Sequence, residues 1–160
     1  MKKKLLLFIF IVLFVITGCK KQEEDDSKKY ECIKYGFEES ISGMKWKQDI
    51  INTAKIDSSN KLVYYSSTYK YMYETKDDCD YWCDIKVKWN DEINSNRYSG
   101  GHGETKCNCK KKELTEIYIY DDIKNLAGIL RSDIVDLKED NTFDLETWRE
   151  KRLNNGYTCE

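Results

Sequence analysis

The chain of 160 residues contains no proline, only one histidine, and no apolar run long enough for a membrane-spanning helix. Its longest apolar run, residues 5–16, has 12 residues, whereas a spanning helix needs roughly 20. Basic residues are not in surplus, since the formal net charge is −2, and this argues against nucleic acid as a partner. The length and the lack of an internal repeat indicate one domain.

The first 18 residues have the layout of a secretory signal peptide. Residues 2–4 are lysines, the apolar run follows, and small residues close the segment. The sequence Ile16-Thr17-Gly18-Cys19 resembles the lipobox of bacterial lipoproteins, in which the cysteine is acylated and the chain is cut just before it. This resemblance covers about the first 20 residues. It implies that residues 1–18 are removed and that Cys19 carries the lipid.

The residues after the lipobox bear on location and organisation. Lys20 is not the aspartate that in many two-membrane bacteria keeps lipoproteins at the inner membrane, so the resemblance implies an outer-membrane or cell-surface location. Two or three acyl chains anchor firmly, whereas one anchors only marginally. Residues 20–29, KKQEEDDSKK, contain no apolar side chain that would offset the entropy of ordering. We therefore expect a lipidated, disordered tether over 19–30 and a single extracytoplasmic domain over 31–160.

Export would place the other cysteines in an oxidising compartment, where disulfides form. Setting Cys19 aside leaves six: Cys32, Cys79, Cys83, Cys107, Cys109 and Cys159. Cys107 and Cys109 would lie about 7 Å apart on an extended strand, too far for an unstrained bond with each other. The most economical scheme joins Cys32 to Cys159, and joins the pair Cys79 and Cys83 to the pair Cys107 and Cys109 in either of two ways.

Those last four cysteines also allow a second interpretation, a tetrahedral zinc site with four thiolates. Structural zinc sites usually pair cysteines two to four residues apart, so the spacing of Cys107 and Cys109 is not typical, and export argues further against zinc. A thiol oxidoreductase is disfavoured because the C-x-x-C spacing is absent. We expect structural disulfides, with neither a metal nor a cofactor.

Two segments around these cysteines show the alternation of one-sided β-strands. In residues 83–90, Cys83, Ile85, Val87 and Trp89 alternate with polar residues, which predicts a strand with its cysteine facing the core. In residues 113–122, two isoleucines, Ile117 and Ile119, alternate with tyrosines. Counting back from them, if no bulge intervenes, places Cys107 and Cys109 on the isoleucine side.

Residues 61–74 are rich in β-forming residues and predict further strand, with Tyr69, Tyr71 and Tyr73 on one face. The turn signal at residues 57–60 precedes this segment, and Ser66-Ser67 is a candidate break within it. Residues 41–56 fit either a helix or a strand.

The C-terminal part predicts helices. Ile123, Leu126, Ala127 and Leu130 recur at helical spacing. In residues 144–156, Asp144 is a candidate N-cap, Gly156 is a candidate stop, and Leu145, Trp148 and Leu153 form one stripe. The fold class we expect is α+β: a small antiparallel β-sheet with C-terminal helices, stapled by disulfides.

Two groups of residues are candidate binding or catalytic positions. On an exposed face, the ladder of Tyr69, Tyr71 and Tyr73 would stack on sugars or anchor a protein, whereas on a covered face it would be core. His102 lies in the glycine-rich stretch 99–104, and Glu104 is placed to orient its imidazole. Such a stretch between strands is more typical of a hairpin loop.

The leading functional hypothesis is a lipid-anchored, non-catalytic binding module of the cell envelope, with a protein or glycan ligand contacted by the tyrosines and the 91–104 loop. A second hypothesis is inhibition of a secreted hydrolase. Tyr30-Glu31-Cys32 with the late Cys159 is similar to short lipoprotein inhibitors of lysozyme, although their Ser-Gly-x-x-Tyr loop is not reproduced here. A third is an envelope enzyme that uses His102 and Glu104, which would have to converge in a pocket.

Overall fold

The structure is a computed structural model that describes residues 26–95, 100–126, 131, 134 and 137–160. The predicted signal peptide, Cys19 and most of the predicted tether lie outside these residues. The elements, in chain order, are β1 (Lys28–Ile41), β2 (Met44–Ile56), β3 (Leu62–Tyr73), α2 (Lys76–Asn94), β4 (Gly101–Asn108), β5 (Glu113–Tyr120), the 3₁₀ turn η1 (Ile123–Asn125), α4 (Leu145–Asn154) and β6 (Thr158–Cys159).

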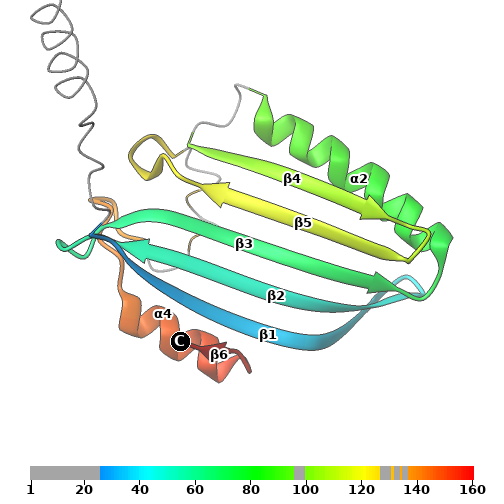
Figure 1. The fold of residues 1–160 in the computed structure, drawn as a ribbon, viewed down its shortest axis with the longest axis horizontal. Helices are drawn as coiled ribbons and strands as arrows, with labels where there is room; N and C mark the ends of the chain where they lie inside the picture. Colours follow the sequence, from blue (N-terminus) through cyan, green and yellow to red (C-terminus); the bar gives the residue numbers. More distant parts are fainter. Residues whose placement is uncertain (1–25, 96–99, 127–130, 132–133, 135–136) are drawn as a thin grey trace, which may run out of the picture.

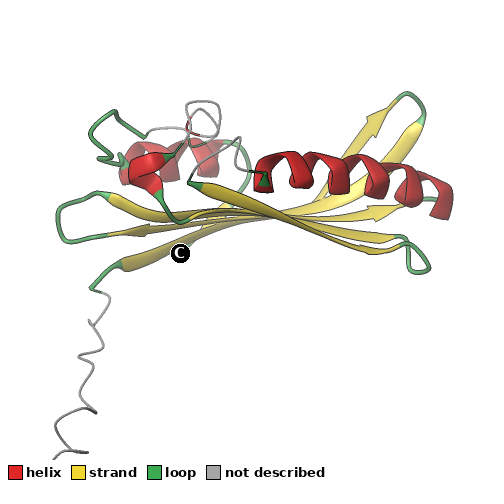
Figure 2. Cartoon of the chain, turned by 90° about the horizontal axis from the view of Figure 1, so that it is seen from above, coloured by secondary structure: helices red, strands yellow, loops and turns green. Residues whose placement is uncertain are grey.

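The strands form one antiparallel sheet in the order β4-β5-β3-β2-β1-β6 (Figure 1). The two described α-helices lie on the same side of it, with α2 along β4 at one edge and α4 near β1 at the other (Figure 1 and Figure 2). The predicted α+β class holds only in its coarse form, because the domain is mostly sheet and its longest helix lies in the middle of the chain. We call the side that carries the helices the inner face.

Two tight turns set the register of β1, β2 and β3. Ser42 and Gly43 both have positive φ, 52° and 86°, as a two-residue type I′ hairpin requires. At the next turn, the carboxylate of Asp57 accepts hydrogen bonds from the backbone N–H groups of Ser59 and Lys61. The turn predicted at 57–60 is confirmed, and the undecided segment 41–56 is mostly strand β2.

Two boundaries differ from the sequence-based prediction. Strand β1 already begins at Lys28, inside the segment predicted as tether, because residues 28–30 pair with β2 opposite residues 54–56. Strand β3 continues through Ser66 and Ser67, which do not break it. Both serines are buried and pair with β2 on one side and β5 on the other. Pairing with two flanking strands therefore outweighs the weak preference of the serines themselves for β-strand.

The predicted strand at residues 83–90 is wrong, because this segment belongs to helix α2. The hydroxyl of Thr75 caps the helix by accepting a hydrogen bond from the N–H of Asp78. Asp77 and Asp78 add negative charge to the first turn, as the helix dipole prefers. Cys79 and Cys83 lie four residues apart and therefore share one helix face.

Three disulfides staple the domain, as predicted. Cys32–Cys159 joins β1 to β6 across 127 residues of chain. Of the two schemes left open for the other four cysteines, the structure has Cys79–Cys109 and Cys83–Cys107, which bind α2 to the β4–β5 hairpin. These four sulfurs form two disulfides, so they are not free as thiolates to bind zinc, and the zinc interpretation is not supported.

The inner face of β5 is not the isoleucine side. Residues 109–112 separate β4 from β5, so residues of opposite parity face each other, and Cys107 lies opposite Leu114. Leu114 and Glu116 are buried on the inner face, whereas Ile117 and Ile119 point to the other side. Counting back from the isoleucines in steps of two gave the wrong face, because the hairpin loop determines which residues of β4 lie opposite which residues of β5.

The C-terminal prediction is correct in part. Helix α4 is present, with the Asp144 carboxylate accepting a hydrogen bond of 3.1 Å from the N–H of Thr147, and Gly156 follows its end with φ of 81°. Trp148 is buried, but Leu153 is 52% exposed and does not share its stripe. The first predicted helix can be followed only at its start, where residues 123–125 form the single turn η1, and residues 127–130 lie outside the described part.

The inner face carries two hydrophobic clusters. The larger lies beneath α4 and η1 and centres on Tyr65 and Trp148, whose ring centroids are 6.4 Å apart. The smaller lies near the start of α2 and comprises Trp46, Tyr73, Cys79 and Leu114. The candidate site borders the smaller cluster, since Trp46 and Tyr73 also line it.

Candidate functional site

The predicted tyrosine ladder exists, but it lies on the inner face. Tyr69, Tyr71 and Tyr73 leave β3 on one side, and successive ring centroids are 6.2 and 6.1 Å apart at an interplanar angle of 18°. Tyr73 is buried, whereas Tyr69 and Tyr71 are half-buried. The ladder is therefore neither an open platform nor plain core, because α2 covers it from one side only.

A cavity of about 300 Å³ opens between this ladder and helix α2. Three sheet residues from β2 and β3 (Trp46, Tyr71 and Tyr73) and Trp82 of α2 supply its aromatic walls. Its polar lining consists of Glu39, Gln48 and Lys86, and Ile41 completes it. We call this cavity the aromatic cleft.

Two tryptophans shape the aromatic cleft. The ring centroids of Trp46 and Trp82 are 6.0 Å apart at an interplanar angle of 61°, an edge-to-face arrangement. Trp46 also contacts Tyr73, with ring centroids 6.0 Å apart. Within the described part of the chain, neither buried indole N–H has a hydrogen-bond acceptor. A buried donor without an acceptor costs about 1–3 kcal/mol, so an acceptor brought within reach of either N–H, both of which neighbouring atoms cover, would remove this cost.

A buried ion pair forms one end of the cleft. The Nζ atom of Lys86 lies 2.8 Å from a carboxylate oxygen of Glu116, whose side chain is 1% exposed. The hydroxyls of Tyr71 and Tyr118 both donate hydrogen bonds to the same carboxylate. Lys86 also lies 5.7 Å from the centre of the Tyr71 ring, within range of a cation–π contact. The network ties α2 to the middle of the sheet.

The tyrosines around Glu116 resist ionisation. Burial and the Glu116 carboxylate raise the pKa of the Tyr71 and Tyr118 hydroxyls well above the usual value. Burial and the neighbouring Tyr65 raise the pKa of Tyr69 to about 12. These hydroxyls are therefore neutral hydrogen-bond donors at physiological pH and not acid–base groups.

A second cavity of about 300 Å³ lies further along α2, on the other side of the ion pair. Its lining residues are Ser67, Tyr69, Trp89, Ile93, Tyr118 and Tyr120. Because Tyr69 stacks on Tyr71, the two cavities share the tyrosine ladder as a common wall. The Lys86–Glu116 pair thus divides one aromatic groove into two compartments.

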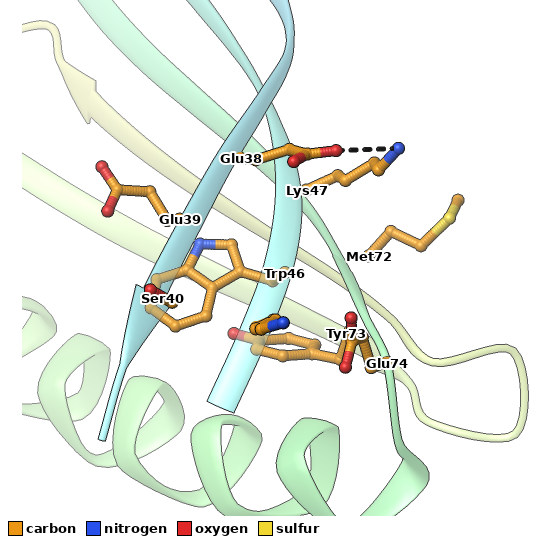
Figure 3. A pocket seen from close by; sticks show the side chains of 9 residues that line it. Glu38, Glu39, Ser40, Trp46, Lys47, Met72, Tyr73 and Glu74 are labelled. Carbon is orange, nitrogen blue, oxygen red and sulfur yellow. Dashed lines mark ion pairs between the residues drawn. The ribbon is translucent and has the colours of Figure 1, made fainter. Parts of the chain in front are cut away.

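A larger hollow, of about 590 Å³, lies at the end of the sheet around the β1–β2 hairpin (Figure 3). The ion pair between Lys47 and Glu38, with a distance of 3.1 Å, lies along one side of it. Trp46 and Glu39 lie on the other side of β2 in this view and also line the aromatic cleft. The hollow therefore adjoins the cleft at the exposed end of the sheet.

His102 and Glu104 do not lie in these cavities. Both leave β4 on the opposite face from Gly103, which is buried beneath α2. His102 lies 3.9 Å from the carboxylate of Asp121, and Glu104 lies 3.0 Å from Lys106. The stretch 91–104 is not the predicted loop, because residues 91–94 end α2 and residues 101–104 begin β4, while 96–99 lie outside the described residues.

Sequence reasoning identified the tyrosines but missed three residues that complete the site, Trp46, Lys86 and Glu116. One signal was available for Glu116, since a carboxylate between Leu114 and Tyr118 interrupts the buried side of a strand. The spacing of Trp82 and Lys86, four residues apart, places both on one flank of a helix, but only if the segment is assigned as helix.

Comparison of the chain with protein-family models, with curated proteins and with solved structures finds no match. In the described part of the chain, no helix has the length and apolar character needed to cross a bilayer. The candidate function therefore rests on the geometry and chemistry of the aromatic cleft.

Proposed function

We propose that this protein is a lipid-anchored, non-catalytic binding module of the bacterial cell envelope, and that the aromatic cleft binds an uncharged saccharide. The observation that carries this proposal is the pair of buried, unpartnered indole N–H groups of Trp46 and Trp82 on an aromatic cavity. The three disulfides support an oxidising environment outside the cytoplasm. The lipobox-like sequence ending at Cys19 supports the anchor.

The chemistry of the cleft favours a sugar over a purely apolar ligand. Aromatic rings stack on the C–H faces of sugars, and the half-buried Tyr71 and Trp82 provide such rings. A sugar hydroxyl both accepts and donates hydrogen bonds, so one ligand group satisfies an indole N–H and another donates to Glu39 or Gln48. An apolar ligand would leave both indole donors unpaired.

The charges favour an uncharged ligand. Lys86 is the only cationic residue among those that line the cleft, and Glu116 already neutralises it at 2.8 Å. Glu39 adds a carboxylate at the wall, and no described cation pairs with it. An anionic saccharide would therefore face repulsion from Glu39 without gaining a free cation.

The position of the cleft suits a module held by its N-terminus. Strand β1 begins at Lys28, close to the predicted tether, and Glu39 at the cleft lies 11 residues further along the same strand. At about 3.3 Å per residue, β1 separates the two by roughly 35 Å. A domain anchored through Cys19 would thus present the cleft away from the membrane surface.

The test is a calorimetric titration of the purified protein with three neutral oligosaccharides, maltohexaose, cellohexaose and N-acetylchitohexaose. We expect at least one to bind, and we expect Trp82→Phe, which keeps the ring and removes the N–H, to weaken that binding about 10-fold, equivalent to about 1.4 kcal/mol. Trp46→Phe should act in the same direction.

Tyr81→Phe is the matched control, because Tyr81 precedes Trp82 on α2, is 55% exposed and does not line the cleft. It should leave the dissociation constant unchanged. The proposal fails if none of the three sugars binds at millimolar concentration, or if both tryptophan variants bind as tightly as the unaltered protein.

A further inference from the structure

The two edges of the sheet differ in whether their outward backbone groups have hydrogen-bond partners. At the β4 edge, the side-chain amide of Asn94 donates to the carbonyl of Gly103 and accepts from its N–H, both at 2.8 Å. Asn90 of the same helix donates to the hydroxyl of Thr105. Helix α2 therefore supplies the hydrogen bonds that a further strand would make, and this edge is closed to strand addition.

The β1 edge is covered over only part of its length. Strand β6 pairs with Cys32 and Ile33 alone, and the Cys32–Cys159 disulfide holds it there. Glu31 exchanges two backbone hydrogen bonds with Glu160, at 3.1 and 2.8 Å. Beyond the bulge between Lys34 and Phe37, no described strand pairs with the outer side of residues 37–41.

The hairpin geometry shows which backbone groups point outward on this free segment. Ile41 and Met44 flank the two-residue turn and form a hydrogen-bonded pair, so hydrogen-bonded and non-bonded pairs alternate back along β1. Glu38 and Ser40 therefore direct their N–H and C=O groups away from β2. Consistent with this phase, the carbonyl of Lys45, opposite Ser40, accepts a hydrogen bond from β3 at 3.3 Å.

The free edge borders the hollow of about 590 Å³ at the hairpin, which has space for the side chains of an added strand (Figure 3). Three residues of the edge, Glu38, Glu39 and Ser40, line it. Glu74 lies across the hollow, so its lining has three carboxylates and two lysines, Lys45 and Lys47. The edge itself, from Phe37 to Ile41, carries two carboxylates and no basic side chain.

We propose that residues 37–41 of β1 bind an extended peptide segment of a partner protein by strand addition, and that this segment carries lysine or arginine at alternating positions. Main-chain hydrogen bonds to Glu38 and Ser40 would give affinity. Basic side chains on one face of the added strand would meet the carboxylate of Glu39, because Glu38 points to the other face and already pairs with Lys47 at 3.1 Å. This site is distinct from the saccharide cleft, although the two share Glu39.

A second copy of the chain fits this edge poorly. Antiparallel pairing of two copies centred on residue 38 places Glu38 opposite Glu38, and pairing centred on residue 39 places Glu39 opposite Glu39. Like charges directly opposite each other on adjacent strands are destabilising. The acidic edge therefore selects a basic partner and disfavours its own copy.

The test uses fluorescein-labelled peptides and anisotropy with the full chain in detergent micelles. We expect KVKVKVK to bind at least 10-fold more tightly than EVEVEVE. Two further versions of KVKVKVK are N-methylated, one on the lysine amides and one on the valine amides. We expect one of the two to lose at least 10-fold in affinity, because successive amides point to opposite sides of a strand and only one set faces β1.

Two protein variants locate the site. Ser40→Pro removes an outward N–H without removing a hydrogen bond to β2 and should weaken KVKVKVK at least 10-fold. Glu39→Lys should also weaken the binding of KVKVKVK at least 10-fold, and it serves as the alternative variant if Ser40→Pro does not fold. Glu104→Lys, on the capped β4 edge, should have no effect.

Three results would overturn the proposal: equal binding of KVKVKVK and EVEVEVE, retention of affinity in both N-methylated versions, or no loss on Glu39→Lys. Sedimentation of the protein alone provides a further check. A dimer that Ser40→Pro dissociates would show that the edge binds a second copy and would likewise overturn the proposal.

Discussion

The ammonium group of Lys86, on helix α2, lies 2.8 Å from the carboxylate of Glu116, on strand β5. The Glu116 side chain is 1% exposed, and two tyrosine hydroxyls donate to it, so the charge is fully enclosed by its partners. Because this pair joins the helix to the middle of the sheet, it fixes the width of the aromatic groove that we assign to ligand binding.

Removal of one member of this pair should destabilise the fold strongly. Lys86→Met leaves the Glu116 carboxylate buried without a cation, and the loss should be about 3 kcal/mol in the free energy of unfolding. The double variant Lys86→Met/Glu116→Gln should recover a large part of it, because no uncompensated charge remains. Urea denaturation measures each value.

Lys88→Met is the matched control for that series. Lys88 lies two residues further along α2 and is exposed, so its substitution should change the stability by no more than about 0.5 kcal/mol. Equal effects of Lys86→Met and Lys88→Met would contradict the role assigned to the ion pair.

Stability should fall at alkaline pH because of the buried tyrosines. Burial raises the pKa of Tyr69 from 10.0 to about 12, and burial with the Glu116 carboxylate raises those of Tyr71 and Tyr118 further. A hydroxyl with a raised folded-state pKa stabilises the fold fully below pH 10, and this contribution is lost as pH rises through the folded-state pKa. We expect constant stability from pH 7 to 10 and a decline from pH 10 to 12.

Thermal melting across this range measures the decline, and tyrosinate absorbance reports the ionisation. The Tyr118→Phe variant should show a shallower decline than the unaltered protein, whereas Tyr35→Phe, at a position 71% exposed, should leave the pH profile unchanged. A profile that already falls between pH 8 and 10 would be inconsistent with these raised pKa values.

The disulfides should contribute unequally. Cys32–Cys159 closes a loop of 127 residues, for which the chain-entropy relation gives about 5 kcal/mol. Cys83–Cys107 lies within the loop that Cys79–Cys109 already closes, so it removes less entropy from the unfolded chain. The paired substitutions Cys32→Ser/Cys159→Ser should therefore lower stability more than Cys83→Ser/Cys107→Ser. The reverse order in chemical denaturation would show that native packing around the helix outweighs loop closure.

Gly100 should not tolerate a side chain. Its φ is 82°, and a Cβ atom there would lie 2.5 Å from the carbonyl oxygen of Asp122 and 2.6 Å from the Cα of Leu126. Gly36 provides the comparison, since its φ is 61° but a Cβ would meet nothing within 4 Å. Gly36→Ala should cost about 1 kcal/mol from backbone strain alone, and Gly100→Ala about 3 kcal/mol or more. Equal losses would contradict the close approach of the two backbones.

The sequence predicts those parts of the fold that are specified locally. The turn at 57–60, the strand that carries the tyrosine ladder and the cap and stop of α4 each depend on a few neighbouring residues. The pairing of Cys32 with Cys159 also follows, because the other four cysteines fall into two close pairs that bond with each other.

The sequence does not resolve the middle of the chain, because two periodicities coincide there. Apolar residues at every second position from Cys83 to Trp89 mimic a strand, while the cap at Thr75 and the spacing of Cys79 and Cys83 suit a helix. Contacts distant in sequence decide between them, including both disulfides to the β4–β5 hairpin. The cleft depends on this choice, since Trp82 and Lys86 face the sheet only from a helix.

Lipid anchoring and disulfide formation are both measured by the intact mass of the membrane-extracted protein with and without reduction. We expect a chain that begins at Cys19, carries the added mass of its acyl chains, and gains six hydrogens on reduction of its three disulfides. A protein recovered from the cytosol with residues 1–18 still attached and its cysteines reduced would contradict this expectation.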